Sequence, residues 1–192
     1  MRYSADHKQE SRRKVLAAAA SAIREHGPEG VSVAAVMAEA GLTHGGFYAH
    51  FPSKSSLIAA AIDTMFDESS ARLDKVMKGK DARAALSAHI DGYLSSAHCR
   101  ARDSGCPFAA LGSDVPRLDA AAQAAFARGT TRRQQRLMEL LRGAGVADAE
   151  TAAYSLRSEL LGALVGARLA APPDREAVLE ASRRALKQRF GL

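Results

Sequence analysis

Tryptophan is absent from this chain of 192 residues, and other aromatic side chains are few, with six phenylalanines and four tyrosines. Aromatic and β-branched residues favour strands, whereas alanine is the best helix former and a poor strand former. Alanine recurs in runs such as residues 17–20, and no stretch alternates apolar and polar residues for long enough to indicate a sheet. The composition therefore predicts an all-α protein.

Cysteine is also scarce, and long apolar runs are missing. The two cysteines, Cys99 and Cys106, are too few for a disulfide scaffold. The longest stretch without Asp, Glu, Lys or Arg covers residues 40–53, contains three glycines, and is too short and too polar to cross a bilayer. Residues 1–8 lack the apolar segment of a secretory signal. We therefore expect a cytoplasmic protein that does not associate with a membrane.

The excess of positive charge is modest, with 27 Lys and Arg against 21 Asp and Glu and a net charge of +6. Such a charge permits a polyanionic partner without requiring one. Residues 1–64 hold seven Lys and Arg against six Asp and Glu, so net charge does not locate a nucleic-acid site there. Placement is more informative, because Lys8, Arg12, Arg13 and Lys14 lie close together at the start of the first expected helix.

Glycine and proline divide the first third of the chain into short helical segments. Apolar residues at helical spacing predict a helix over residues 9–25, and the Gly-Pro-Glu-Gly sequence at 27–30 ends it. Two short helices are expected over residues 33–40 and 44–50, and a longer one follows residue 53. Ser32, Thr43 and Ser53 are predicted N-caps. Phe47 and Phe51 are expected in the core.

The remaining residues predict four further helices. Their ranges are 81–102, 116–142 and 149–171, and a last one from Asp174 toward Phe190. A Gly-Cys-Pro sequence breaks the chain between the first two, and two consecutive prolines end the third. Asp148 and Asp174 are predicted N-caps.

A helix, a turn containing Gly41 and a second short helix from Thr43 have the geometry of a helix-turn-helix, whose second helix enters the DNA major groove. Small or polar residues lie on the outward side of that second helix, and small side chains allow its backbone to approach phosphates and bases. The Tyr48 hydroxyl and the Lys54 ammonium are suited to phosphate contacts. Because two adjacent glycines each disfavour a helix by about 1 kcal/mol, we expect this segment to fray without DNA.

The segment from Val33 to Leu57, V-x-x-V-M-x-x-A-G-L-T-x-G-G-F-Y-x-H-F-x-S-K-x-x-L, resembles the N-terminal domain of TetR-type (tetracycline-repressor family) regulators. Met37 departs from the small residue common there. The resemblance implies a helix-turn-helix DNA-binding domain over residues 1–52 and a helical ligand-binding and dimerisation domain over 53–192. It further implies a ligand-responsive homodimer that represses transcription from a palindromic operator in double-stranded DNA until a small-molecule effector releases it. The implied DNA contacts are Ser32, Ala34, Thr43, His44, Gly46, Tyr48, His50 and Lys54.

The last two helices are the expected dimer interface, because leucines around residues 156–169 exceed what one core-facing stripe requires. The competing interpretation is an ordinary internal helix pair. A ligand pocket is expected among the helices between them and the N-terminal domain. Its candidate lining residues, each more often core than ligand contact, are Met65, Phe66, His89, Tyr93, Phe108, Leu111 and Met138.

An alternative trigger is a thiol. Cys106 precedes a proline at an expected helix start, with arginines nearby, and Cys99 is positioned to resolve a sulfenic acid. Two inert buried thiols are the competing interpretation. A Cys/His-dependent enzyme is disfavoured because no strand-turn-helix elbow, phosphate loop or HExxH sequence is present. An architectural DNA-binding dimer without a ligand is a further alternative. We predict no metal and no cofactor.

Overall fold

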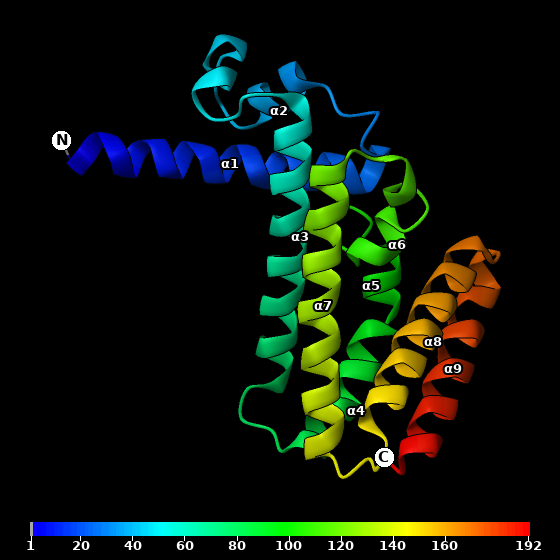
Figure 1. Cartoon of the computed structure of the whole chain (residues 1–192). Helices are drawn as coiled ribbons and strands as arrows, with labels where there is room; N and C mark the ends of the chain where they lie inside the picture. The colour runs from blue at the N-terminus through cyan, green and yellow to red at the C-terminus, as the bar shows by residue number, and fades with distance from the viewer. Residues whose placement is uncertain (1) are drawn as a thin grey trace.

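The computed structural model describes residues 2–192, with side chains from Asp6 onward, and every regular element in that range is a helix (Figure 1). The α-helices are α1 (Arg2–His26), α2 (Val33–Glu39), α3 (Lys54–Met77), α4 (Ala82–Tyr93), α5 (Ser96–Arg100), α6 (Pro107–Leu111), α7 (Ala120–Gly143), α8 (Ala149–Leu169) and α9 (Arg175–Phe190). The 3₁₀ helices are η1 (His44–Ala49), η2 (Val115–Arg117) and η3 (Pro172–Asp174). The predicted all-α class is confirmed.

Side-chain caps define the start of α2, α3 and α8 as predicted. The Ser32 hydroxyl accepts from the amide of Ala35, and Asp148 accepts from that of Thr151. Ser53 forms a capping box with Ser56, in which each hydroxyl accepts from the backbone amide of the other residue.

Two other predicted residues, Thr43 and Asp174, stand at N-cap positions but make no side-chain cap. Thr43 makes no side-chain cap hydrogen bond, and the segment after it is a 3₁₀ helix ending at Ala49 rather than an α-helix to His50. Asp174 has right-handed helical φ and ψ at the end of η3, so it lacks the extended backbone with which an N-cap side chain reaches forward.

Three predicted helices begin or end elsewhere. The helix expected over residues 81–102 is interrupted at Leu94, because the Ser95 hydroxyl accepts from the amide of His98 and starts a new short helix. The helix expected from Pro116 begins at Ala120, where the Asp119 carboxylate caps the amide of Ala122, and Pro116 lies in η2. The first helix is longer than predicted at its N-terminal end.

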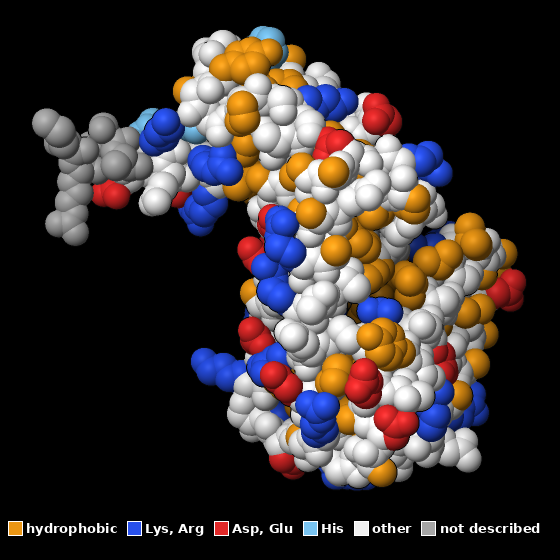
Figure 2. Space-filling view, viewed as in Figure 1, with side chains coloured by type: hydrophobic (Ala, Val, Ile, Leu, Met, Phe, Trp, Pro, Cys, Tyr) orange, Lys and Arg blue, Asp and Glu red, His pale blue; other side chains and the backbone are white. Residues whose placement is uncertain are grey.

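Long helices α3 and α7 lie side by side through most of the molecule, with α1 crossing them near one end and α8 and α9 paired on the other side of α4 (Figure 1). Ion pairs join Arg128 to Asp63 at 2.8 Å and Arg132 to Asp67 at 3.0 Å along the exposed edge of α3 and α7. Figure 2 shows blue and red side chains alternating there.

Two apolar clusters fill the described part of the chain. The first joins α1, α2, η1 and the N-terminal half of α3 to Leu111, Ala122 and Ala125. The second joins α4, α8 and α9 to the C-terminal half of α7. The division at residues 52 and 53 stays a prediction, and the first cluster extends across it. Within residues 2–192, no helix is long and apolar enough to span a membrane.

Candidate functional site

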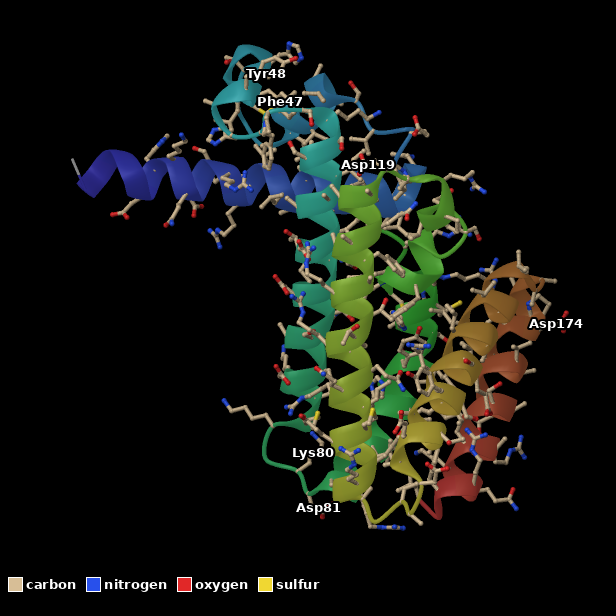
Figure 3. All side chains as sticks on the ribbon, in the orientation of Figure 1. Phe47, Tyr48, Lys80, Asp81, Asp119 and Asp174 are labelled. Atoms are coloured by element: carbon tan, nitrogen blue, oxygen red, sulfur yellow. The ribbon has the colours of Figure 1, made fainter. Side chains whose placement is uncertain are left out.

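The end of the molecule formed by α2 and η1 is a compact tip held by aromatic packing. Phe47 and Phe51 are buried, as predicted, and their rings stack with centroids 5.9 Å apart. Tyr48 packs edge-on against Phe47 but is 73% exposed. Figure 3 shows Tyr48 at the outer end of the tip, far from α8 and α9. The sequence therefore buries one aromatic side chain of this pair and presents the other to solvent.

Arg12 fixes the tip to α1. Its guanidinium donates to the carbonyl of His50 at 2.7 Å and lies 4.2 Å from the centroid of the Phe51 ring. Burial, reinforced by Lys8 and Arg12, lowers the pKa of His50 below its ordinary value, so its imidazole is neutral near pH 7. Arg12 thus acts inside the protein, although the sequence grouped it with basic residues available to phosphate.

The other predicted DNA-contacting residues lie mostly on the exposed side of the tip. The exposed ones are Ser32, Ala34, Thr43 and His44, and Gly46 is half-buried. Lys54 begins α3 and donates to the carbonyl of Glu29 at 3.2 Å. A Cβ at Gly45 would meet nothing within 4 Å, and one at Gly46 only ordinary contacts at 3.8 Å. The fold itself therefore does not require this pair of glycines, whereas Gly41 in the turn has a φ of +73°.

A cavity of about 350 Å³ lies between α3, α4, α5 and α7. Its lining includes His89, Tyr93, His98, Cys106 and Arg133. The exposed Ala97 and Ser104 also line it, so it opens to solvent. A narrow extension of about 20 Å³ shares part of this polar lining and reaches Phe66 and Phe108.

The structure brings together only part of the predicted ligand-binding set. His89 and Tyr93 line the cavity, and Phe66 and Phe108 line its extension. Met65 and Leu111 are completely buried in the first apolar cluster, and Met138 packs against the second. These three side chains are outside the lining of the cavity and its extension.

Burial dominates the electrostatics of the cavity. It lowers the pKa of His89 to about 3, with Arg133 and His98 adding to the effect, and it lowers the pKa of His98. It also raises the pKa of Tyr93, whose hydroxyl donates to the Sγ of Cys106 at 3.0 Å. Both imidazoles and the phenol are therefore neutral near pH 7. Cys99 is buried and free, as is Cys106, but does not line the cavity.

Sequence reasoning missed Arg133 and His98. Arg133 lies four residues before Leu137, on the side of α7 that also carries Leu140 and Leu141. A charged residue in the register of an apolar helix face is the signal that identifies it. His98 had no comparable signal, because its position depends on the unpredicted break at Leu94 and Ser95.

Comparison with known proteins matches residues 15–61 to the sequence model of bacterial regulatory proteins of the tetR family. The uncharacterized HTH-type transcriptional regulator YfiR of Bacillus subtilis (strain 168) is 29% identical over 86 residues. That alignment covers 45% of this chain and 42% of the relative, so it spans less than half of either protein.

Solved structures share the fold over nearly the whole chain. NemR of E. coli in its reduced form has a TM-score of 0.80 at 20% identity, covering 93% of this chain and 95% of NemR. A TetR transcriptional regulator from Chloroflexus aurantiacus J-10-FL has a TM-score of 0.82 at 22% identity, covering 97% and 96%. Residues 15–61 therefore match the tetR family of bacterial regulatory proteins, and the chain as a whole shares the fold of solved TetR-type regulators.

Proposed function

We propose that this protein is a dimeric, DNA-binding repressor that a small-molecule effector releases from its operator. The observation that carries the proposal is the tip, where buried Phe47 and Phe51 hold a short segment whose Tyr48 is 73% exposed. A helix-turn-helix uses such a segment to enter the major groove, while residues beside it bind phosphate. The proposed contacts remain Ser32, Ala34, Thr43, His44, Gly46, Tyr48, His50 and Lys54.

Two half-sites require a twofold partner, and α8 offers a surface for one. Of the four large apolar residues that are notably exposed in the described chain, Tyr154, Val165 and Leu169 lie on α8. Gly162 has open space around it, whereas Gly166 lies against Val178 of α9. We therefore propose that α8 and α9 form the homodimer interface, as in a four-helix arrangement.

Arg24 supplies a route from the cavity to the tip. It lies in α1, donates to Glu68 in α3 at 2.6 Å, and donates to the carbonyl of Asp103 at 3.2 Å. Asp103 immediately precedes cavity residue Ser104, and Glu68 precedes cavity residue Ser69. A ligand that moves either segment therefore shifts α1, and through Arg12 the tip. The proposed mechanism is a population shift to a dimer whose tips no longer match successive major grooves.

Selection of bound duplexes from a random DNA pool tests the proposal, because the operator need not be identified beforehand. We expect enrichment of a palindromic sequence, and recovery of no enriched sequence contradicts operator binding. Screening the selected duplex against a metabolite library then tests effector release. Since linkage is reciprocal, an effector that binds free and DNA-bound dimer equally contradicts the proposed mechanism.

Lys54→Ala should weaken binding to the selected duplex by about tenfold at low salt and reduce the salt dependence by about one ion. The reason is the loss of one phosphate contact at the tip. The matched control is Lys80→Ala, which removes the same charge just beyond the opposite end of α3, as Figure 3 shows. Fluorescence anisotropy across a salt series measures, for each variant, the slope of the logarithm of DNA affinity against the logarithm of salt concentration. Equal slopes for the two variants exclude the Lys54 contact.

A thiol trigger at Cys106 is the second candidate function. It is favoured by the position of Sγ in the cavity lining and by the hydroxyl of Tyr93 that donates to it. We expect N-ethylmaleimide to alkylate Cys106 before Cys99 and to reduce DNA affinity, because the added group occupies the cavity. Cys106→Ser should abolish this response and Cys99→Ser should retain it. Mass spectrometry with anisotropy checks both, and unchanged DNA affinity after alkylation rules out the trigger.

A further inference from the structure

Arg133 is a buried cation that the described protein leaves without a partner. Its side chain projects from α7 into the cavity and its extension, and the residue is only 9% exposed. Its Nη1 is buried and donates to no acceptor, and the hydrogen bonds and ion pairs of the described residues do not include Arg133. Burying an unpaired guanidinium is costly, and arginine stays protonated in proteins. Because the unpaired guanidinium of Arg133 destabilises the fold, its retention suggests a bound ligand as the missing partner.

The cavity contains no carboxylate to neutralise this charge. Among the described residues its lining includes no Asp or Glu, and both lining histidines are neutral near pH 7. The acidic residue whose charge acts on Arg133 is Asp74, and its carboxylate is already paired with Arg136 at 3.0 Å. Arg72 lines the same cavity on its exposed side and adds a second guanidinium, so the lining has an excess of positive charge, which favours an anionic ligand.

The residues that line the cavity with Arg133 include both polar and apolar side chains. The Nε2 of His89 is buried without a hydrogen-bond partner, which leaves a second polar atom available to a ligand. Leu73 and Val76 line the main cavity, and Phe66 and Phe108 line the extension. A volume of about 350 Å³ falls within the range of small-molecule sites.

From this arrangement we infer that the cavity binds a small organic monocarboxylate, whose carboxylate pairs with Arg133 and whose apolar body lies against Leu73 and Val76. Arginine binds a carboxylate through two parallel N–H donors, and the low-polarity surroundings strengthen that pair. A phosphate monoester has similar oxygen acceptors but carries nearly two charges, whereas Arg133 offers a single buried guanidinium and Arg72 lies on the exposed side of the lining. This inference deepens the proposed function by naming the class of effector, and it rests on that function only for the regulatory consequence.

Isothermal calorimetry on the full-length protein tests the inference with hexanoate, benzoate, phenylacetate and 1-naphthoate, each beside its primary amide. We expect at least one carboxylate to bind, each binding carboxylate to exceed its amide by about tenfold or more, and phenyl phosphate to bind more weakly than benzoate. In Arg133→Met the preference for carboxylate over amide should disappear. Binding of no carboxylate, or equal binding of acids and amides, overturns the inference, and tighter phenyl phosphate binding reassigns the class to phosphate esters and overturns it as well.

Arg133→Met should also raise the melting temperature of the ligand-free protein, because an apolar side chain of similar length replaces an unpaired buried charge. The matched control is Arg132→Met, which removes the neighbouring exposed arginine and its ion pair with Asp67, and should leave the carboxylate preference intact. A lower melting temperature for Arg133→Met makes Arg133 a structural residue and contradicts the inference.

The selected DNA duplex separates this inference from the proposed function. Carboxylates that bind through Arg133 without changing DNA affinity support the binding site and contradict ligand-controlled repression. Neutral ligands that bind the cavity and release DNA support ligand control and contradict the carboxylate assignment.

Discussion

Gly129→Ala should lower the free energy of unfolding by about 2–3 kcal/mol, although alanine is the better helix former by about 1 kcal/mol. A Cβ at this position would lie 2.7 Å from Cε2 of Phe66 and closer still to Cγ and Cδ2. The Phe66 ring cannot move aside easily, because it packs edge-on against Phe108 at 5.5 Å and against Phe126 at 5.2 Å. The glycine is what allows α3 and α7 to approach at this level.

Urea unfolding at a fixed protomer concentration measures the loss. The matched control is Gly92→Ala in α4, where a Cβ meets nothing within 4 Å and stability should stay equal or rise. Phe66→Leu should partly rescue Gly129→Ala in a double-mutant cycle, because the smaller side chain vacates the overlapping volume. A Gly129→Ala protein as stable as wild type contradicts this account of the α3–α7 contact.

Glu68→Gln should cost about 3 kcal/mol of folding stability, more than Arg24→Met, which removes the partner on the other side of the same ion pair. The Arg24 side chain is 2% exposed, whereas that of Glu68 is 35% exposed. In Glu68→Gln the guanidinium stays buried and charged with only neutral acceptors, which are the Gln amide oxygen and the carbonyls of Met65 and Asp103. Without the guanidinium, Glu68 can turn to water.

The same urea titrations measure this difference between the two variants. The double variant Arg24→Met/Glu68→Gln should have a free energy of unfolding close to that of Arg24→Met alone. A larger loss for Arg24→Met than for Glu68→Gln reverses the expected order and shows that packing of the Arg24 alkyl chain, not charge, dominates there. Since Arg24 joins α1 to Glu68 and Asp103, which adjoin the cavity residues Ser69 and Ser104, both variants should weaken the proposed response of DNA affinity to an effector.

Local chemistry explains why the N-terminal helices were predictable. Ser32 and Ser53 cap by bonding to amides three residues away, and the Gly41 turn needs only its own backbone, so sequence spacing contains the information. The family motif extended this to an assignment of the tip. Predicted residues such as Tyr48 lie exposed there, although their DNA contacts remain predictions.

Long-range packing explains why the cavity was predicted only in part. Met65 and His89 both lie on the buried faces of their own helices, and neither sequence position shows which one borders empty space. That distinction depends on how α3, α4 and α7 meet, and on the short α5 that Ser95 creates. Arg133 was missed because the leucines of α7 dominate the apolar face on which it lies. Only the packed structure shows that a cavity adjoins this cation.

The first apolar cluster has a consequence for protein engineering. Leu111, Ala122 and Ala125 complete the packing around α1 and the start of α3. A fragment truncated after residue 52 would therefore expose apolar side chains that support the tip. A chimaera that joins the N-terminal helices to the C-terminal domain of another protein must therefore include α6 and the first turns of α7. The tip and the helices that pack beneath it form one transferable unit.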